Sequence, residues 1–474
     1  MARRQVVIIH GWSDTSRSFQ PLVKFLTHNG YEAKLLWLGD YISQDDDVRV
    51  EDVAKRMNEL VREKIRRREL SRNFDVIAHS TGALVARAWL TTWYHDDPEE
   101  CPMKRLVMLA PANYGSKLAA TGKSVLGRVF KGYNNWFETG QSMLNDLELA
   151  SPYQWELAQR DVLVAPHGDP ANFYGDGLIW PFVITGTHPY TSMMRQIVNE
   201  NGSDGTVRVC AANLNARGVT LDFRQSDARK IRIPWGSKLE AEVPLAVLPT
   251  RTHGSIIDPE RALGDNQEDI VETPEEKALL GKLILQALAC ENFDAYQSIQ
   301  ASWDQISEET AARRDAPGQQ HPEIYHQYMQ GNFAARDDQG APVTDYMLEF
   351  FSNTDKRHDE ANVYMQSQVI EEIKRNTQNA ALRNVLFDRT DLMEGYYAKL
   401  PAGTEPILYL SISAAAPGRN IAYFSSQKTG AEGEVPLHLE AHATQRWLRR
   451  NTTHFIQIII PRMPAEKVFR LAKV

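Results

Sequence analysis

The sequence predicts an α/β protein, built on a doubly wound and mostly parallel sheet, that is followed by a β-rich domain. Three observations lead to this prediction. In the first part of the chain, short β-branched runs alternate with helical stretches, as in folds whose parallel strands are joined by helices. Later apolar runs follow one another without regular helical crossovers. The length of 474 residues also exceeds the usual size of one domain.

Four short apolar runs are expected to form buried strands of one parallel sheet. Each run ends at a turn signal, which is typical of a strand that is covered on both faces. These runs are residues 6–9, 74–79, 106–110 and 182–185. Helices are expected at 53–68 and 83–94, so the strands are expected to be joined by right-handed crossovers.

A helix at 273–288 is expected to close the first domain. Thr273 is an N-cap residue, Pro274 occupies the first helical position, and Glu276 completes a capping box. From Ser307 to about Pro342 the residues are mostly charged and polar. We therefore expect three parts: a first domain at 1–300, a linker at 301–342 and a β-rich accessory domain at 343–474.

The accessory domain is expected to be a sandwich of antiparallel strands, interrupted by one helix at 362–375. Strands that lack helical crossovers favour this architecture. The expected strands are residues 346–351, 407–412, 421–424 and 454–460. No motif in this domain indicates a function.

The composition excludes several classes of protein. A net charge of -8 argues against nucleic acid as the main partner, because phosphate binding needs clustered positive charge. The three cysteines, Cys101, Cys210 and Cys290, are too few and too widely spaced for a disulfide framework. No apolar run approaches the roughly 18 residues that span a bilayer, and no signal peptide is visible. A cytoplasmic location is expected, with export by a non-classical route left open.

The segment Ala78-His79-Ser80-Thr81-Gly82 has the pattern of a nucleophile elbow. It lies between an expected strand and an expected helix, which is the context that this sharp turn requires. Small residues two positions before and after the serine let the chain pass, although alanine stands where glycine is more usual. Ser80 is therefore the expected nucleophile; the alternative is a loop serine that caps a helix.

The segment His10-Gly11-Trp12 follows the first expected strand. An acyl-transfer enzyme needs backbone N–H groups that stabilise a developing oxyanion, and a glycine at a strand end lets the backbone turn toward the substrate. Trp12 and Thr81, which follows the nucleophile, are the expected oxyanion-hole donors. For His10 we expect a structural role.

These motifs resemble those of the α/β-hydrolases, in particular bacterial lipases and lecithin-cholesterol acyltransferase-like enzymes. In that family an Asp-Gly-x-Val loop carries the catalytic acid, and Asp204-Gly-Thr-Val207 matches it. The segment from Ala110 to Leu118 also resembles the one that follows the next strand of the family. The resemblance covers roughly residues 5–290 through four short motifs and does not extend to the accessory domain.

Hydrolases of this fold present serine, acid and histidine in that order along the chain. His253 is the next histidine after Asp204, and the later ones fall in the expected linker or accessory domain. His253 is thus the expected base. Asp176 is a rival for the acid, but it precedes the strand at 182–185 whereas Asp204 follows it.

A cap or lid insertion is expected at about residues 112–180. Within it, apolar residues from Val125 to Phe137 recur near helical spacing with basic residues on other faces. Such a helix can lie at a lipid interface, and ordinary packing over the active site is the alternative.

The expected function is that of a serine lipase or carboxylesterase that acts on acylglycerol-type lipids through an acyl-serine. Phospholipase or thioesterase activity is the nearer alternative, and a catalytically silent interaction protein is the alternative from another class. No cofactor and no metal are expected, because Ser-His-Asp chemistry needs neither. The expected partner is a small-molecule or lipid ester, and nothing in the sequence indicates a protein partner.

Overall fold

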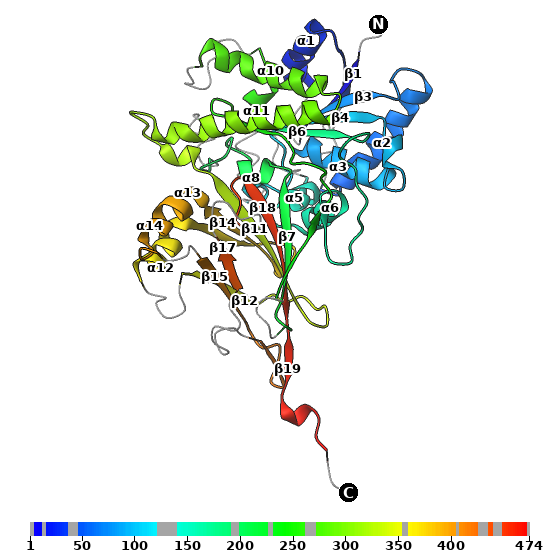
Figure 1. The fold of residues 1–474 in the computed structure, drawn as a ribbon. Helices are drawn as coiled ribbons and strands as arrows, with labels where there is room; N and C mark the ends of the chain where they lie inside the picture. Colours follow the sequence, from blue (N-terminus) through cyan, green and yellow to red (C-terminus); the bar gives the residue numbers. More distant parts are fainter. Residues whose placement is uncertain are drawn as a thin grey trace. The chain divides into compact units, whose positions relative to one another are not determined.

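The computed structural model describes residues 4–11, 16–36, 46–120, 140–190, 199–225, 231–260, 272–352, 359–403, 407–424, 435–438 and 448–471 (Figure 1). The chain divides into two compact units. The first unit comprises 1–164, 168–215 and 237–326, and the second comprises 165–167, 216–236 and 327–474. The segment 216–236 thus belongs to a different unit from the residues before and after it.

The first unit contains a six-stranded sheet in the order β10-β6-β4-β3-β1-β2. All neighbouring strands in it are parallel, which confirms the prediction of a doubly wound parallel sheet. The strands are β1 (Gln5–Ile9), β2 (Glu32–Leu36), β3 (Phe74–His79), β4 (Met103–Leu109), β6 (Trp180–Gly186) and β10 (Leu245–Leu248).

Helices cover both faces of this sheet. On one face, apolar residues of α1 (Gln20–His28), α10 (Pro274–Ala289) and α11 (Phe293–Ala312) share a core with Val6, Ile8 and Ile77. On the other face lies α3 (Thr81–Trp93), which packs against α2 (Val50–Arg66) and α6 (Pro152–Asp161). The shorter elements of this unit are α5 (Gln141–Leu147), α8 (Val209–Ala212), β5 (Leu163–Val164), and the 3-10 turns η1 (Ser16–Phe19), η2 (Pro98–Glu100), η3 (Lys117–Ala120), η5 (Ser255–Ile257), η6 (Arg313–Asp315) and η7 (Pro322–Tyr325). The two residues of β9 (Gly236–Ser237) fall on either side of the boundary between the units.

The expected capping box of α10 is present. The Glu276 N–H donates to Thr273 Oγ1 at 3.2 Å, and the Thr273 N–H donates to Glu276 Oε2 at 2.7 Å. These two bonds satisfy backbone donors that a helix leaves unpaired at its N-terminus.

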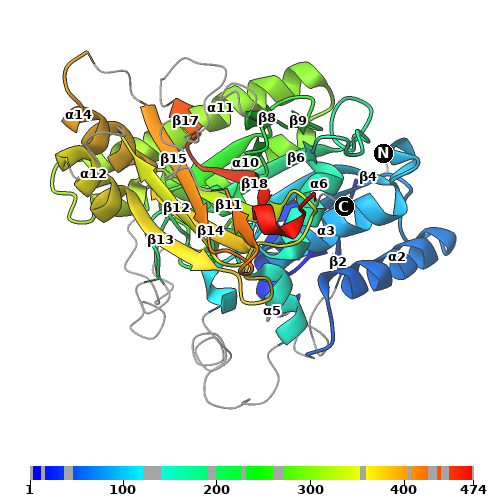
Figure 2. The same ribbon diagram turned by 90° about the horizontal axis from the view of Figure 1, so that it is seen from below.

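The second unit contains a mixed six-stranded sheet in the order β13-β14-β11-β18-β7-β8 and a three-stranded sheet in the order β12-β15-β17 (Figure 2). One apolar core contains residues of both sheets, among them Leu221, Phe333, Phe350 and Ile412. The strands are β7 (Ala216–Asp222), β8 (Arg232–Pro234), β11 (Tyr328–Asp337), β12 (Tyr346–Phe351), β13 (Ile370–Arg375), β14 (Leu382–Asp388), β15 (Ile407–Ala414), β16 (Ile421–Tyr423), β17 (Val435–His438), β18 (Thr452–Ile460) and β19 (Arg462–Pro464). The remaining elements are α12 (Glu360–Tyr364), the π-helical turns at Met365–Val369 and Leu392–Tyr396, α13 (Arg389–Asp391), α14 (Tyr397–Lys399) and η11 (Glu466–Val468).

The expected β-rich character is confirmed, but the antiparallel arrangement is wrong. β18 pairs in parallel with both β11 and β7. The expectation of one helix over 362–375 is also wrong, because β13 occupies Ile370–Arg375 and pairs with β14. Within the expected linker 301–342 lie the end of α11, two 3-10 turns and β11.

Candidate active site

Ser80 lies at a sharp turn between β3 and α3. Its backbone angles are φ 52° and ψ −123°, which non-glycine residues rarely adopt. The turn depends on small neighbours: a Cβ atom on Gly82 would lie 2.5 Å from the carbonyl oxygen of Ile9 in β1. Ser80 is thereby held at the carboxyl end of the central strand β3, with its side chain partly exposed.

The structure places His253 between Ser80 and Asp204, within hydrogen-bond distance of each. His253 Nε2 lies 3.1 Å from Ser80 Oγ, and His253 Nδ1 lies 2.8 Å from Asp204 Oδ2. A carboxylate can only accept a hydrogen bond, so Nδ1 carries the proton. In the neutral ring Nε2 is then the acceptor, and the Ser80 hydroxyl donates to it.

Backbone hydrogen bonds fix Asp204 in place. Its carboxylate is fully buried, and Oδ1 accepts from the N–H groups of Thr206 at 2.9 Å and Val207 at 2.8 Å. The His253 N–H donates to the Asp204 carbonyl oxygen at 2.8 Å. These bonds leave Oδ2 directed at the imidazole, so the loop determines the orientation of the His253 ring.

His79, which the sequence analysis did not assign to the site, packs against His253. The two ring centroids are 4.8 Å apart, and His79 Nε2 donates to the His253 carbonyl oxygen at 3.1 Å. Phe19 also packs against the His79 ring in an edge-on arrangement. His79 therefore supports the His253 loop from β3. Its position directly before Ser80 is the one signal that could have indicated this role.

The expected oxyanion-hole residues lie partly within the described structure. Thr81 is buried at the first position of α3, where helix geometry leaves the backbone N–H without an intrahelical partner. Gly11 passes close beside the serine, since a Cβ atom on it would lie 2.8 Å from Ser80 Cβ. Trp12 lies outside the described residues, as does the apolar stretch from Val125 to Phe137. His10 is buried, and its ring packs against Phe19.

Asp176, the rival acid, lies elsewhere in the first unit. It borders a cavity that is also lined by Trp180, the first residue of β6, whereas Ser80 follows the last residue of β3. Its N–H donates to Glu240 Oε2 at 2.8 Å. The structure therefore brings Asp204, and not Asp176, to His253.

A buried ion pair connects the helix that follows Ser80 to the expected insertion. Arg87 of α3 donates to both carboxylate oxygens of Asp161 at 2.7 and 2.9 Å, and both side chains are fully buried. Burial alone lowers the pKa of Arg87, but the Asp161 carboxylate outweighs it and raises that pKa above its ordinary value. Tyr174 also donates to Asp161 at 2.9 Å. This pair holds α6 against the helix that begins at the serine.

Within the part of the chain that the structure describes, no helix is long and apolar enough to cross a bilayer.

The fold of this chain also occurs in a solved structure of another protein. Residues 1–147 match the model of a domain of unknown function, DUF7379, and no curated protein is significantly similar in sequence.

The structure of phospholipase PlaB from Legionella pneumophila is similar over 99% of this chain and 96% of that chain, with a TM-score of 0.77 and 24% identity. Its complex with thio-NAD has the same coverage and TM-score at 23% identity. The mature form of the Bacillus licheniformis lipase BlEst2 has a TM-score of 0.34 and 16% identity over 54% of this chain and 87% of that chain. The similarity to PlaB shows that the chain has an α/β-hydrolase fold with a second, β-rich unit.

Proposed function

We propose that this chain is a serine hydrolase that cleaves carboxylic esters of lipids, with Ser80 as nucleophile, His253 as base and Asp204 as the residue that orients the histidine. The observation that carries the proposal is the continuous hydrogen-bond chain from Ser80 Oγ through the His253 ring to Asp204 Oδ2. The strained turn at Ser80 supports it, because strained backbone is concentrated at functional sites.

In this mechanism His253 Nε2 removes the hydroxyl proton as Ser80 Oγ attacks the ester carbonyl carbon. The negative charge that forms on the carbonyl oxygen is stabilised by the Thr81 N–H and by a second N–H that we assign to Trp12. Protonated His253 gives its proton to the leaving alcohol, and an acyl-serine remains. Water then attacks the acyl-serine, with His253 again as base, and releases the fatty acid and free Ser80.

For the substrate we favour a phospholipid over an acylglycerol. The sequence motifs point first to a lipase or carboxylesterase, but the similarity that covers both units is to a phospholipase. An acylglycerol lipase is the second candidate, since several motifs resemble bacterial lipases.

Labelling with a fluorophosphonate probe tests the proposed chemistry. We expect one adduct per folded chain, located on Ser80 by peptide mass spectrometry and absent from Ser80→Ala. Folded wild-type protein that remains unlabelled would contradict the proposal and favour a catalytically silent interaction protein.

The substrate class is tested separately. We expect the purified enzyme to release fatty acid faster from mixed micelles of phosphatidylglycerol than from emulsified triolein at equal accessible ester. The reverse order would favour the acylglycerol lipase, and preference for an acyl-CoA would indicate a thioesterase.

A further inference from the structure

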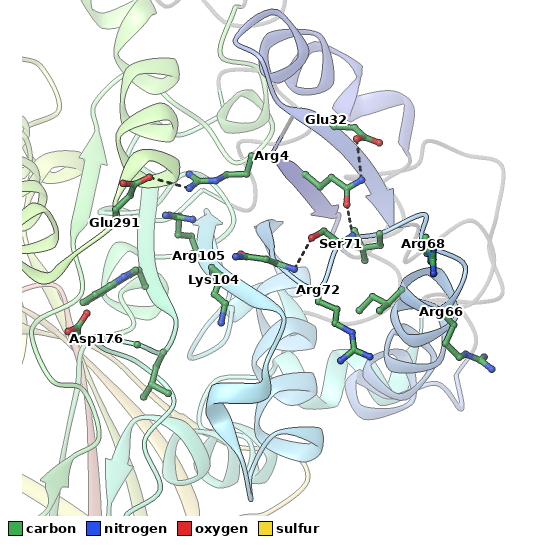
Figure 3. Close-up of a pocket in the computed structure, with 17 residues that line it drawn as sticks. Arg4, Glu32, Arg66, Arg68, Ser71, Arg72, Lys104, Arg105, Asp176 and Glu291 are labelled. Carbon is green, nitrogen blue, oxygen red and sulfur yellow. Dashed lines mark hydrogen bonds and ion pairs between the residues drawn. The ribbon is translucent and has the colours of Figure 1, made fainter. Parts of the chain in front are cut away.

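A basic cavity of about 1340 Å³ lies at the amino ends of the parallel strands in the first unit (Figure 3). Its lining includes Gln5 and Trp180, which begin β1 and β6, and Asn73, which directly precedes β3. Ser80 directly follows β3. Since β3 has six residues and a strand rises about 3.3 Å per residue, the cavity and Ser80 are separated by about 20 Å, at opposite edges of the sheet. The cavity is therefore distinct from the candidate active site.

Positive charge is concentrated in this cavity although the whole chain carries a net charge of -8. Its basic lining residues outnumber its acidic ones, Glu32, Asp176 and Glu291. The basic residues are Arg4, Arg66, Arg68, Arg72, Lys104 and Arg105.

Two of these basic residues are already used within the protein. Arg105 is buried and binds Asp75 at 3.0 Å and the Cys290 carbonyl oxygen at 2.6 Å. Arg4 donates to the Leu288 carbonyl oxygen at 2.6 Å and pairs with Glu291 at 3.4 Å. These contacts are part of the wall of the cavity.

The other four, by contrast, have no carboxylate partner among the described residues. Lys104 contacts only the Cys101 carbonyl oxygen, at 3.3 Å. Arg66, Arg68 and Arg72 are exposed and form no ion pair with any described acid. Figure 3 shows Arg66, Arg68 and Arg72 on the side of the cavity formed by the end of α2 and the segment after it, and Lys104 at the start of β4.

Other basic residues of the same helix do have acidic partners. Arg56 pairs with Glu59, and Arg67 pairs with Glu63, both on α2 or at its end. Lys64 pairs with Glu69. Acids are therefore available along this helix, but Arg66, which lines the cavity, pairs with none of the described ones.

A second cavity, of about 490 Å³, shares Ile65, Arg66, Arg72 and Lys104 with the first. Its lining adds one basic residue, Arg62, and two acidic ones, Glu99 and Glu100. The three shared basic residues thus border both cavities. Guanidinium and ammonium groups that line a cavity present N–H donors to an anion, and phosphate oxygens are acceptors that form strong, charge-assisted hydrogen bonds with such groups.

We propose that this cavity is a second ligand site that binds a phosphate-bearing anion, a diphosphate or phosphate monoester, through Arg66, Arg72 and Lys104. The ligand is either a soluble phosphate compound or the headgroup of an anionic lipid. Arg68 also lines the cavity and has a left-handed backbone conformation, φ 60°, at a helix end where glycine is usual.

Titration calorimetry with inorganic pyrophosphate at low salt tests the proposal on the full chain. We expect the variant Arg66→Gln/Arg72→Gln/Lys104→Gln to bind pyrophosphate at least tenfold more weakly than wild type. The control variant Arg56→Gln/Lys64→Gln/Arg67→Gln changes the charge equally outside the cavity, and its affinity should stay within threefold of wild type. The four arginines are exposed and the two lysines are half-buried, and the melting temperature verifies folding.

Sedimentation with phosphatidylcholine vesicles that contain phosphatidic acid distinguishes the two sources. Pyrophosphate binding without vesicle binding identifies a soluble ligand. Vesicle binding that the cavity variant loses and the control variant keeps identifies a lipid headgroup. Wild-type protein that binds neither probe would overturn the proposal, and so would equal losses in both variants or citrate binding as tight as that of pyrophosphate. These measurements do not involve ester hydrolysis, so they fail or succeed independently of the proposed function.

Discussion

At the scale of single residues, the acid of the proposed mechanism can be tested against its rival. Asp204→Asn should reduce kcat for a soluble ester by roughly a hundredfold or more, because an amide cannot hold the His253 ring in the required tautomer. Asp176→Asn should leave kcat within about twofold, since a side chain beside the cavity at the opposite edge of the sheet does not contact His253. Steady-state kinetics with p-nitrophenyl butyrate measures both. A ranking in the opposite order would transfer the role to Asp176.

The turn at Ser80 allows a second test at this scale. A Cβ atom on Gly82 would lie 2.5 Å from the Ile9 carbonyl oxygen, so Gly82→Ala should lower the free energy of unfolding by about 1–3 kcal/mol through overpacking. Gly254→Ala is the control, because open space surrounds that position and its φ is −83°. Urea denaturation compares the two. Equal stability of both variants would show that β1 can move away from the turn.

At the scale of elements, Asp146 in α5 makes folding depend on pH. Burial raises the pKa of Asp146 to about 6, against about 3.9 in an unfolded chain. Between these values the unfolded state releases a proton that the folded state retains, so stability falls as the pH rises through this window. Above pH 6 the Asp146 carboxylate is charged in the folded state, and the free energy of unfolding is lowered by the full cost of burying that charge.

Asp146→Asn should therefore raise the melting temperature at pH 7.5 and leave it unchanged at pH 4, because the amide never ionises and can still accept from the Val50 N–H. Differential scanning calorimetry at both pH values provides the measurement. The exposed Asp97→Asn serves as the control for a simple change of net charge. A stability gain of equal size at both pH values would exclude the ionisation as its cause.

Local sequence predicted four of the six strands in the sheet of the first unit, because these strands are compact apolar runs that end at turn residues. It also predicted the helices α2, α3 and α10, but it did not predict β2, β10, α1, α6 or α11. β3 matches its expected range, and α10 has the capping box that its first residues indicated. The prediction of a helix over 362–375 was wrong because Ile370 and Ile373 are spaced as on a helix face although they lie in a strand. Pairing with β14 overrides that spacing, and a partner strand is invisible to local patterns.

The same distinction applies to the candidate site. The motifs singled out Ser80, Asp204 and His253, the three residues that the structure brings into one hydrogen-bond chain. The support of His253 by His79 was not foreseen, because it depends on a loop that returns to β3 from 174 positions away. Long-range packing of this kind leaves no periodic signal in the chain.

At the scale of the whole molecule, the two units are not separable by a single cut. A cut at residue 300 divides α11 before Thr310, whose hydroxyl donates to Val247 of β10 at 2.7 Å. Fragment 1–326 retains α11 but leaves β7 without its partner β18. It should aggregate, because Val219, Leu221 and Phe223 belong to the core of the second unit.

Replacing 216–236 in that fragment with a short Gly/Ser bridge should restore a soluble monomer. The replacement removes β7, which belongs to the second unit, and keeps the residues of the first unit on either side of it. Size-exclusion chromatography compares the two fragments. Fluorophosphonate labelling of the bridged form shows whether the site at Ser80 is intact. A monomeric, unaltered fragment 1–326 would show that β7 does not need β18.

The pairing of β7 with β18 also has a consequence for folding during translation, because the two strands are made at different times. Thr220 of β7 and Gln457 of β18 face each other, but 237 positions separate them in the chain. At about 5–20 residues per second, a ribosome needs roughly 12 to 50 s to supply the second strand after the first. Throughout that interval β7, which lies between Asp204 and His253 in the sequence, has not yet paired with β18. We therefore expect the nascent chain to be more prone to aggregation during translation than the finished fold is.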